Sequence, residues 1–202
     1  MGTFTYKDIN SSGSVKLREA QMGSLGGALA QPTTPFGSYI TITEYGIGSD
    51  HLTKLDIAAL PLTLGNTSGI SFGSKQLITL PKGKIHIVSS NVEDYLYDYT
   101  DDEGNVTPIA GTHGGDFSLG STATSDATLN STDVNILAST SYDPFSTAVS
   151  ANSAINVILD GTSTPVSIYL NAIVDDADVA DGASDIIKLS CTMWFKWYWM
   201  AG

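Results

Sequence analysis

The segment at residues 186–200 constrains the fold more than any other stretch of the chain. Its sequence, IIKLSCTMWFKWYWM, places two sets of side chains in alternation. One set is apolar: Leu189, Cys191, Met193, Phe195, Trp197 and Trp199. The other mixes polar and aromatic residues: Lys188, Ser190, Thr192, Trp194, Lys196, Tyr198 and Met200. A period of two puts each set on one face of a strand, whereas a helix would scatter both sets. We therefore predict a long β-strand whose buried face includes Phe195, Trp197 and Trp199.

Further strands are indicated upstream by the same alternation and by β-branched and aromatic residues. We expect them at residues 39–45, 54–64, 75–80, 84–90, 92–100, 116–121, 134–140, 155–160 and 166–174. No helical period separates them, and parallel pairing would need long crossover segments that are usually helical. Few charged residues (15%) and 20 glycines also disfavour helices. The sequence predicts an all-β protein, an antiparallel β-sandwich of jelly-roll type.

Two regions are expected within the 202 residues. Residues 1–35 are small, polar and interrupted by glycine and proline, so we interpret them as an irregular N-terminal arm. Residues 36–202 form the sandwich domain. The arm carries spaced apolar side chains that could fill separate pockets on a neighbouring subunit: Phe4, Tyr6, Leu25 and Leu29. The alternative is a partly ordered terminus without a docking role.

The charge balance argues against two classes of partner. Lys and Arg total 9 and Asp and Glu total 21, which gives a formal net charge of −12. Nucleic acids and anionic membranes are bound mainly through Lys and Arg, so neither is expected as a partner. The first residues, MGTFTYKDINSSGS, lack the basic and apolar regions of a signal peptide, and none is expected.

Residues with catalytic chemistry are few and scattered. The three histidines, His51, His86 and His113, have no nearby histidine partner in sequence, and we expect them to be exposed. Cys191 is the only cysteine, and its place in the apolar set of residues 186–200 predicts a buried, inert thiol. We therefore expect neither an enzyme nor a cofactor.

An acidic segment at residues 175–185 offers a weak calcium hypothesis. Calcium binds six to eight oxygen atoms, and closely spaced carboxylates in a loop can supply several of them. The candidates are Asp176, Asp178 and Asp181. Their spacing does not match an EF-hand, and the simpler interpretation is a solvated turn that keeps the protein soluble.

The second face of residues 186–200 suggests an interface. Trp194, Tyr198 and Met200 share that face, and an isolated soluble domain should not expose them together. We take these three residues, with Tyr169 from the strand at 166–174, as candidates for a subunit interface, where Trp and Tyr are enriched. The alternative is that a loop or the arm of the same chain covers them.

Several segments resemble the β-sandwich decoration, or cement, proteins of tailed bacteriophage capsids. They are LPKGKIHI, DFSLGSTATSDATLN, VILDGTSTPVSIYLNAIVDDADV and WFKWYWMAG, within residues 70–202. The resemblance implies a homotrimer that is assembled in the host cytoplasm and sits on the capsid exterior of the virion. It also implies that the partner is the major capsid protein, that neighbouring copies are clamped together, and that the arm at residues 1–35 reaches an adjacent subunit.

A second class of function stays open on the same residues. A phage tail-fibre head or lectin-like module would also be a sandwich, and it would bind host surface glycans on exposed aromatic rings. Tyr95, Tyr97 and Tyr99 alternate along one predicted strand and would be its platform. A polysaccharide-cleaving enzyme ranks third, because nothing in the sequence places two carboxylates at the separation that such chemistry requires.

Overall fold

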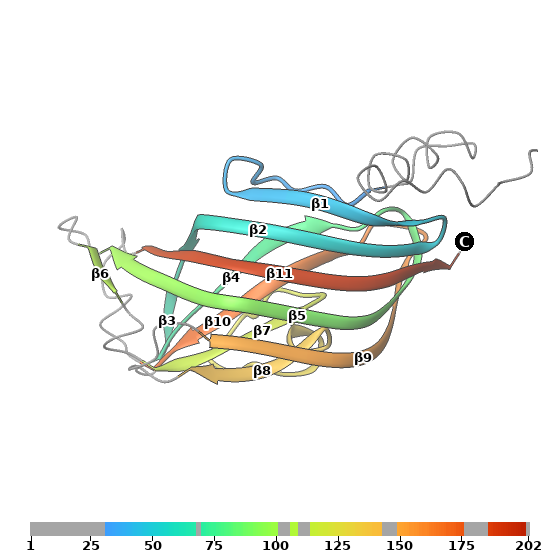
Figure 1. Cartoon of the computed structure of the whole chain (residues 1–202). Coiled ribbons are helices and arrows are strands. Elements are labelled where there is room, and N and C mark those ends of the chain that lie inside the picture. The colour runs from blue at the N-terminus through green and yellow to red at the C-terminus, as the bar shows by residue number, and fades with distance from the viewer. Residues whose placement is uncertain are drawn as a thin grey trace, which may run out of the picture.

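Two antiparallel β-sheets pack face to face in the computed structural model of the chain (Figure 1). The structure describes residues 31–67, 70–100, 106–108, 114–142, 149–175 and 186–200. The first sheet, here the β11 sheet, has the order β1 (Ile40–Ile47), β2 (Asp50–Thr63), β11 (Ile186–Met200), β5 (Gly83–Thr100) and β6 (Val106–Pro108), and β9 (Val149–Gly161) also pairs with β5. The second, the β10 sheet, has the order β3 (Gly65–Thr67), β4 (Ile70–Thr79), β10 (Ser167–Val174), β7 (Gly115–Gly120) and β8 (Leu137–Tyr142). The predicted all-β sandwich is confirmed.

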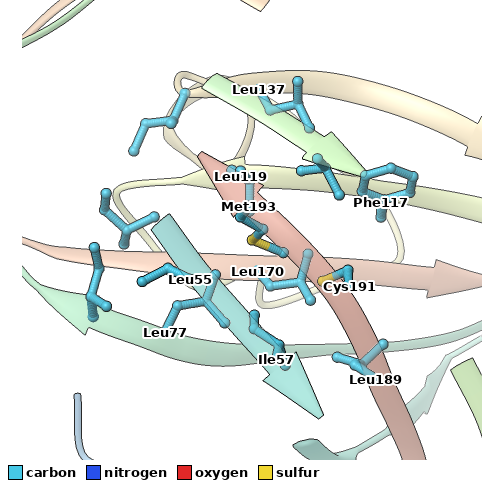
Figure 2. Packing of buried hydrophobic residues seen from close by; sticks show 14 of the residues in the cluster. Leu55, Ile57, Leu77, Phe117, Leu119, Leu137, Leu170, Leu189, Cys191 and Met193 are labelled. Atoms are coloured by element: carbon cyan, nitrogen blue, oxygen red, sulfur yellow. The ribbon is translucent and has the colours of Figure 1, made fainter. Parts of the chain in front are cut away.

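β11 is central to its sheet because it pairs antiparallel with β2 on one side and with β5 on the other. Its apolar set faces inward as predicted, and Phe195 and Trp197 are at most 1% exposed. Side chains of the second sheet meet this row from β4, β7 and β10 (Figure 2). The labelled residues of this core are Leu55, Ile57, Leu77, Phe117, Leu119, Leu137, Leu170, Leu189, Cys191 and Met193.

Trp199 departs from the predicted pattern. It was expected among the buried residues, but it is 39% exposed at the end of β11. Its indole lies against Gly83 so closely that a Cβ at position 83 would collide with it. Gly83 also has a positive φ of 139°, so a side chain there would be strained as well. Trp199 therefore covers the backbone at Gly83 rather than filling the core.

A β-bulge interrupts the pairing of β2 with β11. Ser190 alone faces Ala58 and Ala59, and the register shifts between Leu189 and Cys191. Ala59 has a φ of 50°, a left-handed conformation that is costly for a residue with a Cβ. Ala59 is the extra residue of the bulge, and its backbone N–H donates to the Ser190 hydroxyl over 3.0 Å. The bulge therefore leaves this donor satisfied.

A second bulge lies at the same level across the sheet. In the β5–β9 pair, Ser150 alone faces Glu93 and Asp94, and the β11–β5 pair between the two bulges also shifts register. Asp94 has a φ of 55°, and its N–H donates to the Ser150 hydroxyl over 3.3 Å. We name Ala58, Ala59, Ser190, Asp94 and Ser150 the bulge row. Bulges bend and twist strands locally, so the row marks a transverse bend in the β11 sheet.

The outer face of the β10 sheet is covered by the chain's own loop at residues 121–136, here the covering loop. Asn171 points away from the core, yet it is fully buried beneath this loop. Its Oδ1 accepts from the Thr124 N–H over 2.9 Å, and its Nδ2 donates to the carbonyl oxygens of Thr122 and Asp133 over 3.1 and 2.9 Å. One amide side chain thus fixes the loop at several points along its length.

The described part of the predicted arm also contacts the domain. Thr33 forms backbone hydrogen bonds with Thr79 in both directions, at 2.9 and 2.7 Å, where β4 ends. Residues 1–30, with the proposed arm contacts Phe4, Tyr6, Leu25 and Leu29, lie outside the described residues.

Candidate functional site

The outer face of the β11 sheet carries an aromatic cluster centred on Trp194. The Trp194 and Tyr45 rings stack with centroids 6.1 Å apart and planes inclined by 26°. Lys54 Nζ lies 5.5 Å from the Trp194 ring centroid, which is within the range of a cation–π contact. Lys54 is also held by Asp56 at 2.7 Å, and this hydrogen bond raises the pKa of Lys54. The cluster is therefore flat and fixed by contacts within the sheet.

Tyr198 continues this surface toward β5 and β9. Its ring lies 6.2 Å from that of His86, and Lys196 Nζ lies 5.7 Å from its centroid. His86 Nε2 is in turn 2.6 Å from the Asn156 Oδ1 of β9. His86 faces outward, as predicted from the sequence.

Exposed apolar side chains extend the cluster at both sides. Tyr45 is 39% exposed, Met200 is 42% exposed and Ile158 on β9 is 57% exposed. Ile158 is paired with His86, and His86 is paired with Tyr198, so the residues lie in one row across three strands. We name Tyr45, Trp194, Tyr198, Met200 and Ile158 the aromatic face. Large hydrophobic side chains with high exposure, among the described residues, all lie on the β11 sheet or directly beside it. They are Tyr39, Tyr45, Ile158, Trp199 and Met200.

The structure unites three of the four candidate interface residues. Trp194, Tyr198 and Met200 lie on the outer face of β11, as the alternation predicted. Tyr169 does not join them, because it lies on β10 in the other sheet, where it pairs with Gln76 and Gly120. The alternation of residues 166–174 gave its face within the strand, but not the sheet to which that strand belongs.

His51 is buried rather than exposed, which corrects the sequence-based expectation. It lies in β2, is 2% exposed and stacks on Trp197 with centroids 3.8 Å apart. Its Nδ1 is 3.0 Å from Glu44 Oε1, and the Thr53 hydroxyl donates to Glu44 Oε2 over 2.6 Å. Trp197 Nε1 donates to the Thr53 oxygen over 2.8 Å. This buried chain of polar groups joins β1, β2 and β11.

The sequence analysis did not predict this cluster of Glu44, His51 and Thr53, although the alternation of buried positions indicated that all three face inward. Glu44 has the same parity as the inward-facing Ile40, and His51 and Thr53 have the same parity as the buried Leu55. Thr53 both donates to Glu44 and accepts from the Trp197 indole, so the cluster links three strands within the core. The third histidine, His113, lies outside the described residues.

Cys191 is chemically quiet, as expected. Burial raises the pKa of its thiol to about 12, so the reactive thiolate is not formed at neutral pH. Within the part of the chain that the structure describes, no three His, Cys, Asp or Glu side chains are grouped to hold a metal ion. The calcium candidates Asp176, Asp178 and Asp181 lie outside that part.

The glycan platform suggested by the tyrosine alternation does not form at Tyr95. Its ring is 2% exposed and stacks on Phe117 with centroids 4.0 Å apart, so it belongs to the core. The side chains of Tyr97 and Tyr99 lie outside the described residues.

Comparison of the chain with protein-family models, with curated proteins and with solved structures finds no match. No helix within the described residues is long and apolar enough to cross a membrane. The functional assignment therefore depends on the surface itself.

Proposed function

We propose that this chain is a structural virion protein that decorates a bacteriophage capsid and binds the major capsid protein. The observation that carries the proposal is the aromatic face. It gathers three large rings and two other apolar side chains on one face of a sheet, with Lys54 and Lys196 against the rings, and exposed apolar groups that gather in this way mark interaction sites on soluble proteins. Trp and Tyr are the residues that dominate binding energy at protein interfaces.

The strand order supports the jelly-roll assignment within the sandwich. One sheet contains the series β2-β11-β5-β9, and the other contains β4-β10-β7-β8. Two Greek keys would interleave eight strands in this way, which supports the proposal of a jelly roll, a fold common in viral capsid and lectin domains. Fold alone leaves both functions open, and we take the aromatic face as support for a protein partner.

A homotrimer is the assembly that we propose. The aromatic face lies on paired strands and is held by internal contacts, so docking it on a neighbour would cost little side-chain entropy. The test is the mass of the full chain by light scattering at micromolar concentration. A trimer that Trp194→Ser dissociates supports the proposal, and a monomeric full chain contradicts it.

Capsid binding is tested by co-sedimentation with undecorated capsids of the virus that encodes the chain. Trp194→Ser should lower the bound amount at least tenfold, while Tyr169→Ser, a similar truncation on the other sheet, should leave it unchanged. Equal binding by the Trp194→Ser variant would overturn the role of the aromatic face. Recovery of the native protein with tails in a few copies, rather than with capsids in many copies, would support the tail-fibre alternative.

A further inference from the structure

A groove crosses the solvent face of the β11 sheet beside the bulge row. It has a volume of about 540 Å³, within the range of small-molecule sites. Its lining comes from the start of β1 and from β2, β11 and β5, four strands that are adjacent in the sheet. Three strand spacings make it roughly 14 Å long. The groove therefore has the dimensions of a short oligosaccharide rather than of a single ion.

The two bulges are the reason that a flat sheet has a hollow here. Ala58 on β2, Ser190 on β11 and Asp94 on β5 all belong to the bulge row and line the groove. Asp94 has a left-handed backbone conformation, as does Ala59, which follows Ala58 in β2. Residues in such costly conformations gather at binding sites, where the surrounding structure maintains them.

The groove presents hydrogen-bonding groups from several strands. Hydroxyl groups come from Ser38, Thr41, Ser190 and Thr192, and carboxylates come from Asp56 and Asp94. The Thr192 hydroxyl donates to Asp56 over 3.2 Å, and Asp56 also accepts from Lys54. Hydroxyl and carboxylate oxygens in fixed positions are suited to the O–H groups of a sugar.

The charge of the groove selects against anions. Two carboxylates line it, its described lining contains no Lys or Arg, and Lys54 is paired with the lining residue Asp56. A phosphate, sulfate or sialic acid group would be repelled by these carboxylates, and no cation of the described lining would offset its desolvation. The same carboxylates accept hydrogen bonds from neutral hydroxyl groups.

Tyr39 provides an aromatic ring at the groove. It lines the groove and is 38% exposed, directly before β1. Sugar rings pack their C–H faces on such aromatic faces, while their hydroxyl groups reach polar neighbours. The groove thus combines a stacking ring with a polar wall.

We propose that this groove binds a neutral saccharide. The proposal does not depend on the decoration function, because the groove and the aromatic face occupy different parts of the sheet. It also places glycan recognition at Tyr39, rather than at the tyrosines of β5 that the sequence suggested.

The experiment is isothermal titration calorimetry of the full chain with three neutral probes, maltohexaose, cellohexaose and chitohexaose, and one anionic probe, a hyaluronan hexasaccharide. We expect saturable binding of at least one neutral probe and none of the anionic one. Tyr39→Ala should weaken the neutral probe about tenfold, and Tyr39→Phe should retain its affinity because the ring remains.

Tyr169→Ala is the control, because Tyr169 lies on β10 in the other sheet, outside both the groove and the aromatic face. It should leave saccharide affinity unchanged. Circular dichroism and the melting temperature establish that each variant is folded. The proposal is overturned if no neutral probe binds at millimolar concentration, if the anionic probe binds equally well, or if Tyr169→Ala reduces binding more than Tyr39→Ala does.

Discussion

The outer faces of the two sheets differ in how far they are buried. On the β10 sheet, the covering loop at residues 121–136 lies over the strands, and Asn171 and Ser118 are fully buried beneath it. Ser118 donates to the Asp133 carbonyl oxygen of the loop over 2.8 Å. On the β11 sheet, the aromatic face is partly exposed to solvent.

The two faces differ in the kind of side chain that they present. A loop brings backbone N–H and C=O groups that must find partners, so polar side chains suit the face that the chain covers itself. Aromatic side chains bind another molecule through area and shape, which is the role that we propose for the aromatic face. The difference teaches that buried polar side chains on an outward face mark a cover made of the chain's own backbone.

The largest effect should separate the two faces of β11 itself. Trp197→Ser removes a buried indole and the donor to Thr53, and it should lower the free energy of unfolding by about 3–5 kcal/mol. Trp194→Ser, three residues away on the outer face, should lower it by less than about 1 kcal/mol. Urea denaturation of both variants measures the difference, and equal losses would show that Trp194 belongs to the core.

The substitution Asn171→Ala tests how the covering loop is held on the outer face of the β10 sheet. This change removes the amide contacts to the Thr124 N–H and to the Thr122 and Asp133 carbonyl oxygens. Because Ser74 still accepts from Thr124 and Ser118 still donates to Asp133, the loss should be about 1–3 kcal/mol. The matched control is Asn156→Ala on the outer face of β9, where Asn156 Oδ1 is hydrogen-bonded to His86. The control should cost less than about 0.5 kcal/mol. Faster cleavage within residues 121–136 by a protease would locate the damage, and unchanged cleavage would contradict the anchoring role.

A smaller effect concerns the strained backbone at Ala59 in the β11 sheet. Ala59→Gly should raise the free energy of unfolding by about 0.5–1 kcal/mol, since glycine relieves the left-handed strain at the bulge. Ala58→Gly, at the neighbouring position without a positive φ, should instead lower it slightly. Thermal melts of the two variants should therefore move in opposite directions, and shifts of the same sign would argue against strain at Ala59.

An effect confined to alkaline pH concerns the buried thiol of Cys191 in β11. The pKa of Cys191 is raised from 9.0 to about 12 by burial, so the folded protein keeps a proton that the unfolded chain loses above pH 9. Its contribution to stability is fully present below pH 9 and is lost as the pH rises from 9 toward 12. The melting temperature of the native protein should decline more steeply over this range than that of Cys191→Ala. Parallel declines would show that the thiol ionises equally in both states.

Local alternation was sufficient to predict much of this molecule. The inward set from Leu189 to Trp197 and the outward set of Trp194, Tyr198 and Met200 follow from a period of two, because a strand's pleat determines its faces. The prediction of buried positions from this alternation fails where a bulge interrupts the period of two. Beyond the bulge at Ala58 and Ala59 the buried residues of β2 change from odd to even positions, so Leu60 and Leu62 face inward with Ile57.

Contacts between distant segments could not be predicted in this way. The position of Asn171 in its strand predicts a place on a polar outer face, and only the covering loop makes it a buried anchor. The groove requires Thr41, Asp56, Asp94 and Ser190 from four strands to meet, and no local pattern encodes their order in the sheet. For the same reason, the sequence did not show that Tyr169 lies on the other sheet from Trp194.

The strand interleaving also has a consequence for how the chain reaches its native state. β11 lies between β2 and β5, yet it is synthesised after both, and its bulge contact joins atoms 131 residues apart. Until β11 inserts, two long strands expose inner edges that invite pairing with other chains. Such nonlocal pairing folds slowly, so nascent chains on the ribosome should depend on chaperones that shield these edges until the central strand emerges.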